Sequence, residues 1–114
     1  MQLPVNNLGV SGAFFTDCTV TGDTFDNSQH GTTIIFRNKN ANPRTITIPQ
    51  QVACNFGLLD ANHALTIVIA GDAGLGSFYR VKIDPSKYND SAQLVTLNYS
   101  AVGGLSAAVI AYSD

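Results

Sequence analysis

Residues 44–49, RTITIP, alternate strictly between threonine and isoleucine after an arginine and then reach a proline. Side chains along a β-strand point alternately to its two faces, so this pattern predicts a strand with Ile46 and Ile48 inward and both threonines outward. Pro49 ends the strand, because proline has no backbone N–H to donate to a neighbouring strand. The pattern is that of a half-buried strand, and it favours β-structure for this part of the chain.

Short strand-like segments of this kind recur along the chain, separated by turns rich in Gly, Asp, Asn and Pro. They are residues 13–20, 32–38, 44–49, 64–70, 78–84, 93–100 and 105–113, together with a short strand near residues 3–10. About eight short antiparallel strands fit a jelly roll. An immunoglobulin-like sandwich is the alternative, but the chain has no Trp and therefore no Cys…Trp…Cys pattern. We therefore predict an all-β fold: one antiparallel, jelly-roll-like sandwich over residues 1–114, with residues 1–10 as an N-terminal arm.

Residues 31–50 contain two runs rich in isoleucine and threonine, separated by a polar segment with three asparagines and a proline. This arrangement predicts a β-hairpin. Arg37, Lys39 and Arg44 lie near its tip and make up three of the six basic residues of the chain. Two interpretations of the tip stay open: a solvated turn, or a salt-sensitive contact with an acidic patch on a partner protein.

The composition argues against two classes of partner. The formal net charge is −2 and only 12% of the residues are charged, whereas nucleic-acid binding needs clustered lysine and arginine. No run approaches the roughly 20 apolar residues of a membrane helix, and the N-terminus resembles no signal peptide. We expect neither a nucleic-acid nor a membrane partner. Cys18 and Cys54 lack metal-ligand spacing, and we predict two buried thiols in a reducing cytoplasm rather than a disulfide.

Residues suited to catalysis are few. The only histidines are His30, in a loop rich in Gly and Asn, and His63, which precedes a predicted strand; both fit solvent exposure better than a catalytic triad. No G-x-S-x-G motif is present. The glycine-rich stretch GDAGLGSF lacks the Lys-Ser or Lys-Thr of a phosphate-binding loop, so we predict a mobile loop there. We therefore expect no catalytic residues, and the chain is not expected to be an enzyme.

One loop concentrates oxygen-bearing side chains. Asp23, Asp26 and Asn27 lie within a few residues of each other, and such side chains are ligands that Ca²⁺ prefers. Their spacing differs from that of an EF-hand loop, and Asp and Asn are also common turn formers. We therefore favour an ordinary turn, and predict neither a bound metal nor a cofactor.

The final predicted strand is apolar on both faces. One face carries Leu105, Ala107, Val109 and Ala111, and the other carries Ser106, Ala108, Ile110 and Tyr112. Two interpretations stay open. The strand is buried within the domain, or its outer face packs on a neighbouring subunit, since exposed apolar patches usually mark interfaces.

The order of these features resembles a protein family. The stretch GDTFDNSQHGTTIIFRNKNANPRTITI has a G-x-T-F-x-N/D-type loop, a G-T-hydrophobic strand, an R-N turn and a strand alternating Thr with hydrophobic residues. The stretch FYRVKIDPSKYND…QLVTLNYSAVGGLSAAVIAYS adds a turn with Tyr-Asn, a strand ending in Tyr-Ser and a last strand rich in Leu, Ala and Val. Over about residues 20–112 the chain resembles the small capsid decoration, or cement, proteins of tailed bacteriophages.

The resemblance implies a small β-rich protein, often trimeric, that binds the outside of the expanded head at or near three-fold positions. Such a protein stabilises the shell against the pressure of the packaged DNA. The expected partners are the major capsid protein and further copies of this chain in a homotrimer. The expected location is the capsid exterior of the virion, after synthesis in the host cytoplasm.

The proposed contacts involve three parts of the chain. The N-terminal arm is expected to lie along a capsid subunit or to add a strand to a neighbour, with an ordinary frayed terminus as the alternative. The basic tip and the outer face of the last strand are the other two parts. The candidate interface residues are Gln2, Leu3, Pro4, Val5, Arg37, Lys39, Arg44, Ala108, Ile110 and Tyr112.

A second functional hypothesis is another virion component, either a tail- or fibre-associated adhesin or a carbohydrate-binding module. Sugar binding usually uses exposed aromatic side chains beside polar groups. Tyr79, Tyr88 and Tyr112 are candidates for that role, although the chain has no Trp.

Overall fold

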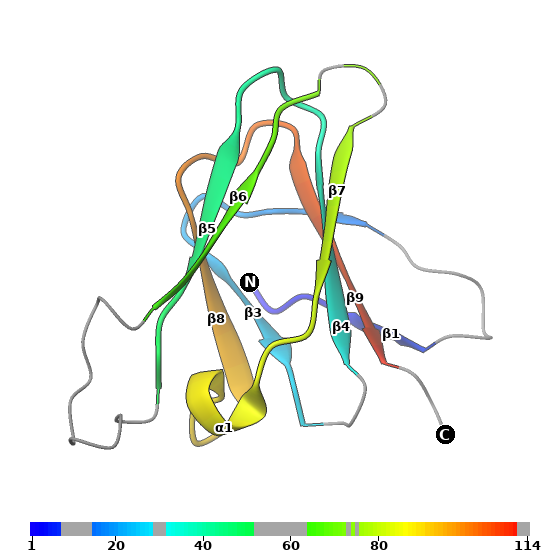
Figure 1. Cartoon of the computed structure of the whole chain (residues 1–114). Coiled ribbons are helices and arrows are strands. Elements are labelled where there is room, and N and C mark those ends of the chain that lie inside the picture. Colours follow the sequence, from blue (N-terminus) through cyan, green and yellow to red (C-terminus); the bar gives the residue numbers. More distant parts are fainter. Residues whose placement is uncertain (8–14, 29–31, 52–63, 73, 75, 112–114) are drawn as a thin grey trace.

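The computed structural model describes residues 1–7, 15–28, 32–51, 64–72, 74 and 76–111. These residues form nine strands in two sheets and one short helix (Figure 1). The strands are β1 (Val5–Asn7), β2 (Thr16–Asp17), β3 (Asp23–Asp26), β4 (Thr33–Asn38), β5 (Arg44–Ile48), β6 (Leu65–Ile69), β7 (Ser77–Val81), β8 (Leu94–Tyr99) and β9 (Leu105–Ala111). The helix α1 (Pro85–Tyr88) is a single turn capped by Asp84, whose carboxylate accepts a hydrogen bond from the Ser86 backbone N–H.

The strand order confirms the predicted jelly-roll-like sandwich. One sheet has the order β1-β9-β4-β7, with β2 also paired to β9, and the other has the order β3-β8-β5-β6. From β2 onward consecutive strands lie in opposite sheets, except for β5 and β6, which pair with each other, and this is the interleaved order of a jelly roll. β1 is an additional strand, and its pairing with β9 is the only parallel one between the named strands.

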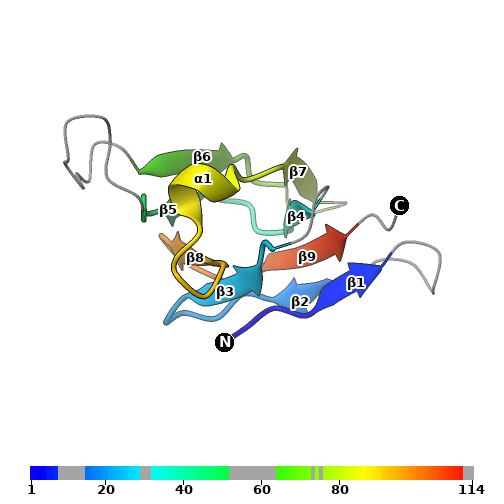
Figure 2. The same cartoon turned by 90° about the horizontal axis from the view of Figure 1, so that it is seen from below.

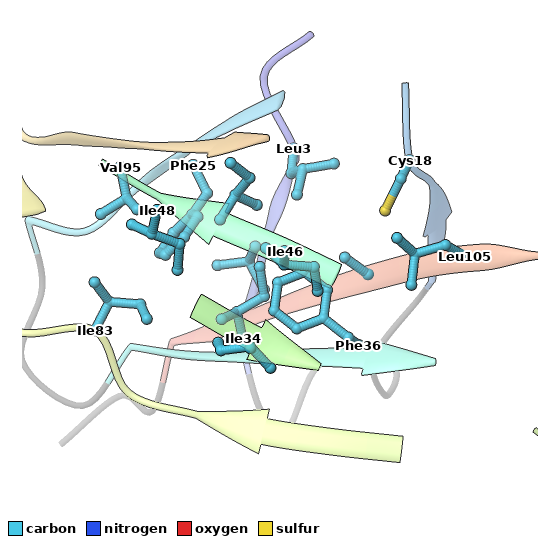
Figure 3. Close-up of a cluster of buried hydrophobic side chains, with 14 of the residues drawn as sticks. Leu3, Cys18, Phe25, Ile34, Phe36, Ile46, Ile48, Ile83, Val95 and Leu105 are labelled. Carbon is cyan, nitrogen blue, oxygen red and sulfur yellow. The ribbon is translucent and has the colours of Figure 1, made fainter. Parts of the chain in front are cut away.

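A single hydrophobic core fills the space between the sheets. Ile34 and Phe36 of β4 face Ile46 and Ile48 of β5, and all four side chains are fully buried (Figure 3). The threonines of β5 are only half-buried, so the alternation of residues 44–49 predicted the inward and outward faces correctly. Burial of one such side chain contributes about 1.5–3 kcal/mol, so these strands supply much of the stability.

The prediction of a β-hairpin over residues 31–50 is wrong. β4 pairs with β7 and β9, whereas β5 pairs with β6 and β8 in the opposite sheet. The polar segment between β4 and β5 therefore crosses from one sheet to the other. Sequence alternation identifies each strand, but it does not say whether consecutive strands pair with each other or face each other across a core.

Asn38, at the end of β4, explains why the chain turns across the sandwich. Its side chain is fully buried, and its Nδ2 atom donates to the carbonyl oxygens of Asn42, Ile69 and Ala70 at 3.0, 3.3 and 3.2 Å. Its Oδ1 atom accepts from the Asn40 backbone N–H at 3.0 Å. Asn38 thus ties the β4–β5 crossing to the end of β6, and its buried side-chain amide is itself fully hydrogen-bonded.

The N-terminal residues are part of the sandwich, which corrects the expected arm over residues 1–7. The Leu3 N–H donates to the Thr24 carbonyl at 2.7 Å, and the Thr24 N–H donates to the Met1 carbonyl at 2.9 Å. Leu3 is 1% exposed and lies in the core (Figure 3). Val5 begins β1. Of the four candidate residues there, only Gln2 and Pro4 are exposed. Residues 8–10 lie outside the described part.

The last strand is buried along its whole length, as one of the two interpretations predicted. Ala108 and Ile110 are buried within the chain itself, so the alternative, in which they face a neighbouring subunit, is wrong. β9 is an interior strand of its sheet, with β1 and β2 on one edge and β4 on the other. Tyr112 lies outside the described residues.

Strand β3 lies in a segment that we predicted to be a loop. Asp23 and Phe25 point inward and are buried, while Thr24 and Asp26 are half-buried. The alternation is present in the sequence, but an aspartate occupies one inward position and conceals it.

Candidate functional site

Strand β7 ends its sheet and leaves one edge open. It pairs with β4 on one side, and no described strand pairs with its other side. β6 ends the second sheet, and Figure 2 shows both strands on the same side of the sandwich. An edge strand presents backbone N–H and C=O groups without partners, which is where another polypeptide can pair.

Large side chains are exposed along this edge strand. Phe78 is 59% exposed and Tyr79 is 41% exposed, and Arg80 and Lys82 are also exposed. Phe78 lies opposite Arg37 of β4, which places it on the outer face of the sheet. Tyr79 lies opposite the buried Phe36, so it points inward as predicted, but it stays accessible because β7 is at the edge.

Two phenylalanines and an arginine form a cluster on the outer face. The Phe15 and Phe78 rings meet edge to face with centroids 6.1 Å apart. The Arg37 guanidinium lies over the Phe15 ring at 4.7 Å from its centroid, a distance typical of cation–π contacts. The buried Nε atom of Arg37 has no hydrogen-bond partner among the residues that the structure describes. Within that part of the chain, the cluster therefore holds a cation on the sheet without a carboxylate partner.

A hollow of about 430 Å³ lies beside this strand, lined by Thr33, Arg80, Val81 and Lys82. The only ion pair among the described residues joins the Met1 amino group and Asp23, so no described carboxylate neutralises Arg80 or Lys82. Two of the six basic residues of the chain thus border one hollow without an acidic partner in the described part. This arrangement is suited to an anionic group.

A second cluster, around Asp23, is structural. Its buried carboxylate accepts hydrogen bonds from the Tyr99 hydroxyl at 2.7 Å and from the Thr19 N–H at 3.0 Å. Burial raises the pKa of the Cys18 thiol to about 12, an effect opposed by its hydrogen bond with Tyr99 and reinforced by Asp23 and Asp17. Burial likewise raises the pKa of Tyr99. A thiol held in its neutral form is a poor nucleophile, so this cluster does not have the features of a catalytic site.

Cys18 is a buried free thiol, as predicted, and Cys54 lies outside the described residues. His30 and His63 also lie outside them. Within the described part of the chain, no three His, Cys or Asp side chains are placed to hold a metal ion.

The oxygen-rich segment 23–27, most of which is strand β3, uses its polar groups internally. The Asn27 Nδ2 atom donates to the Ile83 carbonyl at 3.0 Å and to the Asn89 Oδ1 atom at 2.9 Å. Asp26 accepts from the Ser28 N–H at 2.9 Å, and Asp23 points toward Tyr99. The three residues considered for calcium therefore bind different groups and do not converge.

The three basic residues predicted at a hairpin tip have separate roles. Arg44 donates its Nε and Nη2 atoms to the Gly103 carbonyl at 3.2 and 3.0 Å, which fixes the turn before β9. Arg37 belongs to the phenylalanine cluster, and Lys39 is exposed nearby, since both lie beside Gly76. Their contact with a partner stays a prediction.

Sequence reasoning missed Phe78 as a surface residue. It precedes Tyr79 in an alternating strand, and the alternation places it on the same face as Arg80. An apolar residue on the charged face of a strand is the signal that could have identified it.

None of the described helices is long and apolar enough to cross a membrane. Comparisons of the chain with models of protein families, with curated proteins and with solved structures found no match.

Proposed function

We propose that this protein is a capsid decoration protein that binds the outer surface of a mature bacteriophage head and stabilises it. The resemblance of residues 20–112 to such proteins motivates the proposal. The observation that carries it is the edge strand β7, where Phe78 and Tyr79 are exposed beside cations that have no carboxylate partner in the described part of the chain. Exposed aromatic side chains next to arginine are typical of protein interfaces.

Stabilisation of this kind needs only binding. A protein that binds the intact shell and not its dissociated subunits raises shell stability by its binding free energy. Repetition over many identical sites adds to the total effect. The function therefore calls for a stable fold with a complementary surface.

The direct test is co-sedimentation of the purified protein with undecorated mature capsids of its source virus, titrated to saturation. We expect saturation at a fixed stoichiometry related to the three-fold positions, and a higher temperature of capsid disruption. A Phe78→Ser variant should bind more weakly, while a Val20→Ser variant, which changes an exposed side chain elsewhere, should bind normally. Absence of binding by the unchanged protein would reject the proposal.

Ala108 and Ile110 are buried and supply no surface for a neighbouring subunit. The proposal of a homotrimer therefore rests on the resemblance alone. Light scattering of the free protein tests it. A single mass of about three chains is the expected result, and a monomer at all accessible concentrations contradicts a preformed trimer.

A second candidate is a tail- or fibre-associated adhesin or a carbohydrate-binding module. The exposed Tyr79 beside Arg80 favours it, since sugars stack on aromatic rings next to polar groups. A glycan array distinguishes the two: a defined glycan bound through Tyr79, without binding to capsids, would favour the adhesin.

A further inference from the structure

We propose that the open edge of β7 binds an extended, acidic segment of a partner protein, which joins the sheet as an additional strand. The binding chemistry stands on the structure alone, whereas naming the major capsid protein as the owner of that segment rests on the proposed function.

The backbone of β7 provides the first part of the site. β7 pairs with β4 over five residue positions, from Ser77 to Val81, so it is a regular strand of ordinary length. Its N–H and C=O groups on the side away from β4 have no strand partner in the described part of the chain. Addition of a strand at such an edge forms main-chain hydrogen bonds with little dependence on the partner's sequence.

The charges on the outer face determine which partner fits. Arg80 lies in β7 and Lys82 follows it, so their side chains share one face and are spaced by about 6.8 Å. Neither has a carboxylate partner among the described residues, and both line the hollow beside the strand. Acidic residues at alternate positions of an added strand have the same spacing. An acidic partner is therefore complementary to this edge, and a basic one is repelled.

Aromatic side chains provide apolar contact beside the charges. Phe78 packs against Phe15 on the outer face, and Tyr79 is accessible on the inner face. An added strand places alternate side chains on these two faces. Residues opposite the outer face meet Phe78 and the cations, while residues opposite the inner face meet Tyr79. The expected segment thus combines acidic with β-branched or other apolar residues.

A second copy of this chain is a poor occupant of the same edge. Antiparallel pairing of two β7 strands over their full length places the Arg80 side chains of the two chains diagonally across from each other on one face, about 7–8 Å apart, and the two Lys82 side chains add further positive charge there. Such a pair brings no carboxylate to these cations, and lysine at a sheet edge is a common device against such pairing. The charge pattern therefore favours a different, acidic polypeptide.

The test uses two capped synthetic peptides as probes, TVDVDVT and its isosteric control TVNVNVT. Each is titrated against the ¹⁵N-labelled full chain while the backbone amide signals are followed. We expect the aspartate peptide to bind at least about fivefold more tightly than the asparagine peptide, since two exposed ion pairs form. The largest shifts should fall on residues 77–82. Raising the salt concentration should reduce the difference between the peptides.

Matched variants locate the site. Arg80→Gln combined with Lys82→Gln should remove the preference for the aspartate peptide, because both cations of the hollow are gone. Lys87→Gln removes an exposed cation of α1 and should leave the preference unchanged. Equal binding of both peptides, an absence of binding at millimolar peptide, or shifts centred away from β7 would each overturn the proposal.

The capsid experiment separates this inference from the proposed function. If the unchanged protein binds capsids and the Arg80→Gln, Lys82→Gln variant binds equally well, the decoration function stands and the major capsid protein does not occupy β7. If the unchanged protein binds no capsids but retains the peptide preference, the function fails and the acidic docking edge stands.

Discussion

The two sides of the sandwich end in different ways (Figure 2). On one side, residues 1–3 join the sheets: Gln2 bridges to Thr24 of β3, and three residues later the chain enters β1. On the other side, β6 and β7 end their sheets with no further strand among the described residues. The chain thus closes one side with its own N-terminus and leaves the other available, which concentrates the exposed Val68, Phe78 and Tyr79 on the open side.

The comparison indicates which side of the sandwich stabilises the fold and which side is available to bind a partner. An open edge is a hazard for aggregation, and a buried segment across it removes the hazard. On the closed side lie the buried apolar side chain of Leu3 and the buried carboxylate of Asp23, which accepts a hydrogen bond from Tyr99. The open side uses cations, Arg80 and Lys82, which discourage unspecific pairing but still allow an acidic strand. Changes on the closed side should therefore alter folding, and changes on the open side should alter binding.

The largest effect is expected from Leu3→Ala on the closed side. Removal of a fully buried leucine leaves a cavity, so we expect a loss of about 3 kcal/mol in the free energy of unfolding, measured with urea. Gln2→Ala is the matched control, because that side chain is exposed, makes no hydrogen bond within the described part of the chain, and only its backbone bridges to Thr24. If Leu3→Ala is as stable as the unchanged protein, the N-terminal residues do not hold the sheets together.

A somewhat smaller loss is expected from Asn38→Ala, at the buried end of the interior strand β4 where the chain crosses between the sheets. Three carbonyl groups and one N–H group lose their partner, and we expect a cost of about 2–3 kcal/mol in urea unfolding. Asn42→Ala, at an exposed position of the same crossing, is the control and should cost less than about 1 kcal/mol, since its side chain makes no described bond. Equal effects of the two would mean that the Asn38 bonds do not fix the crossing.

A third effect depends on pH and tests the burial of Cys18 near the closed side. The pKa of the Cys18 thiol is about 12 in the folded chain, whereas the ordinary value of 9.0 applies to the unfolded chain. Above pH 9 the unfolded chain therefore loses a proton that the folded chain keeps. Stability from this group is therefore complete below pH 9 and decreases as the pH rises toward 12. Relative to the Cys18→Ala variant, we expect the free energy of unfolding of the unchanged protein, measured with urea, to decrease by about 1–2 kcal/mol between pH 8 and pH 10.5.

Both proteins in that comparison should carry Cys54→Ser, so that only one thiol titrates. A constant difference between them across this pH range would show that the Cys18 thiol is as accessible in the folded chain as in the unfolded one. The lysines, and the tyrosines other than Tyr99, which contacts Cys18, cancel in the difference because they are the same in both proteins.

The sequence predicted the strands better than their pairing. The alternation in residues 44–49 identified β5 and its inward isoleucines, because side-chain period is a local property. The crossing at Asn38 depends on carbonyl groups of Ile69 and Ala70, which are distant in the sequence, so a local pattern could not reveal it. β7 was recognised as a strand, but its position at a sheet edge follows from topology. The exposure of Tyr79 could therefore not be predicted.

The smallest effect on stability is expected on the open side, from Phe78→Ser. The ring is more than half exposed, so its removal should change the free energy of unfolding by less than about 1 kcal/mol, mainly through the lost contact with Phe15. Val68→Ser is the matched control on β6, the other edge strand, where the side chain is 61% exposed and no cation neighbours it in the strand. If β7 is the binding edge, Phe78→Ser weakens binding of the aspartate peptide, and Val68→Ser leaves that binding unchanged. A loss of stability from Phe78→Ser as large as that from Leu3→Ala would remove the contrast between the two sides, because both would then serve folding.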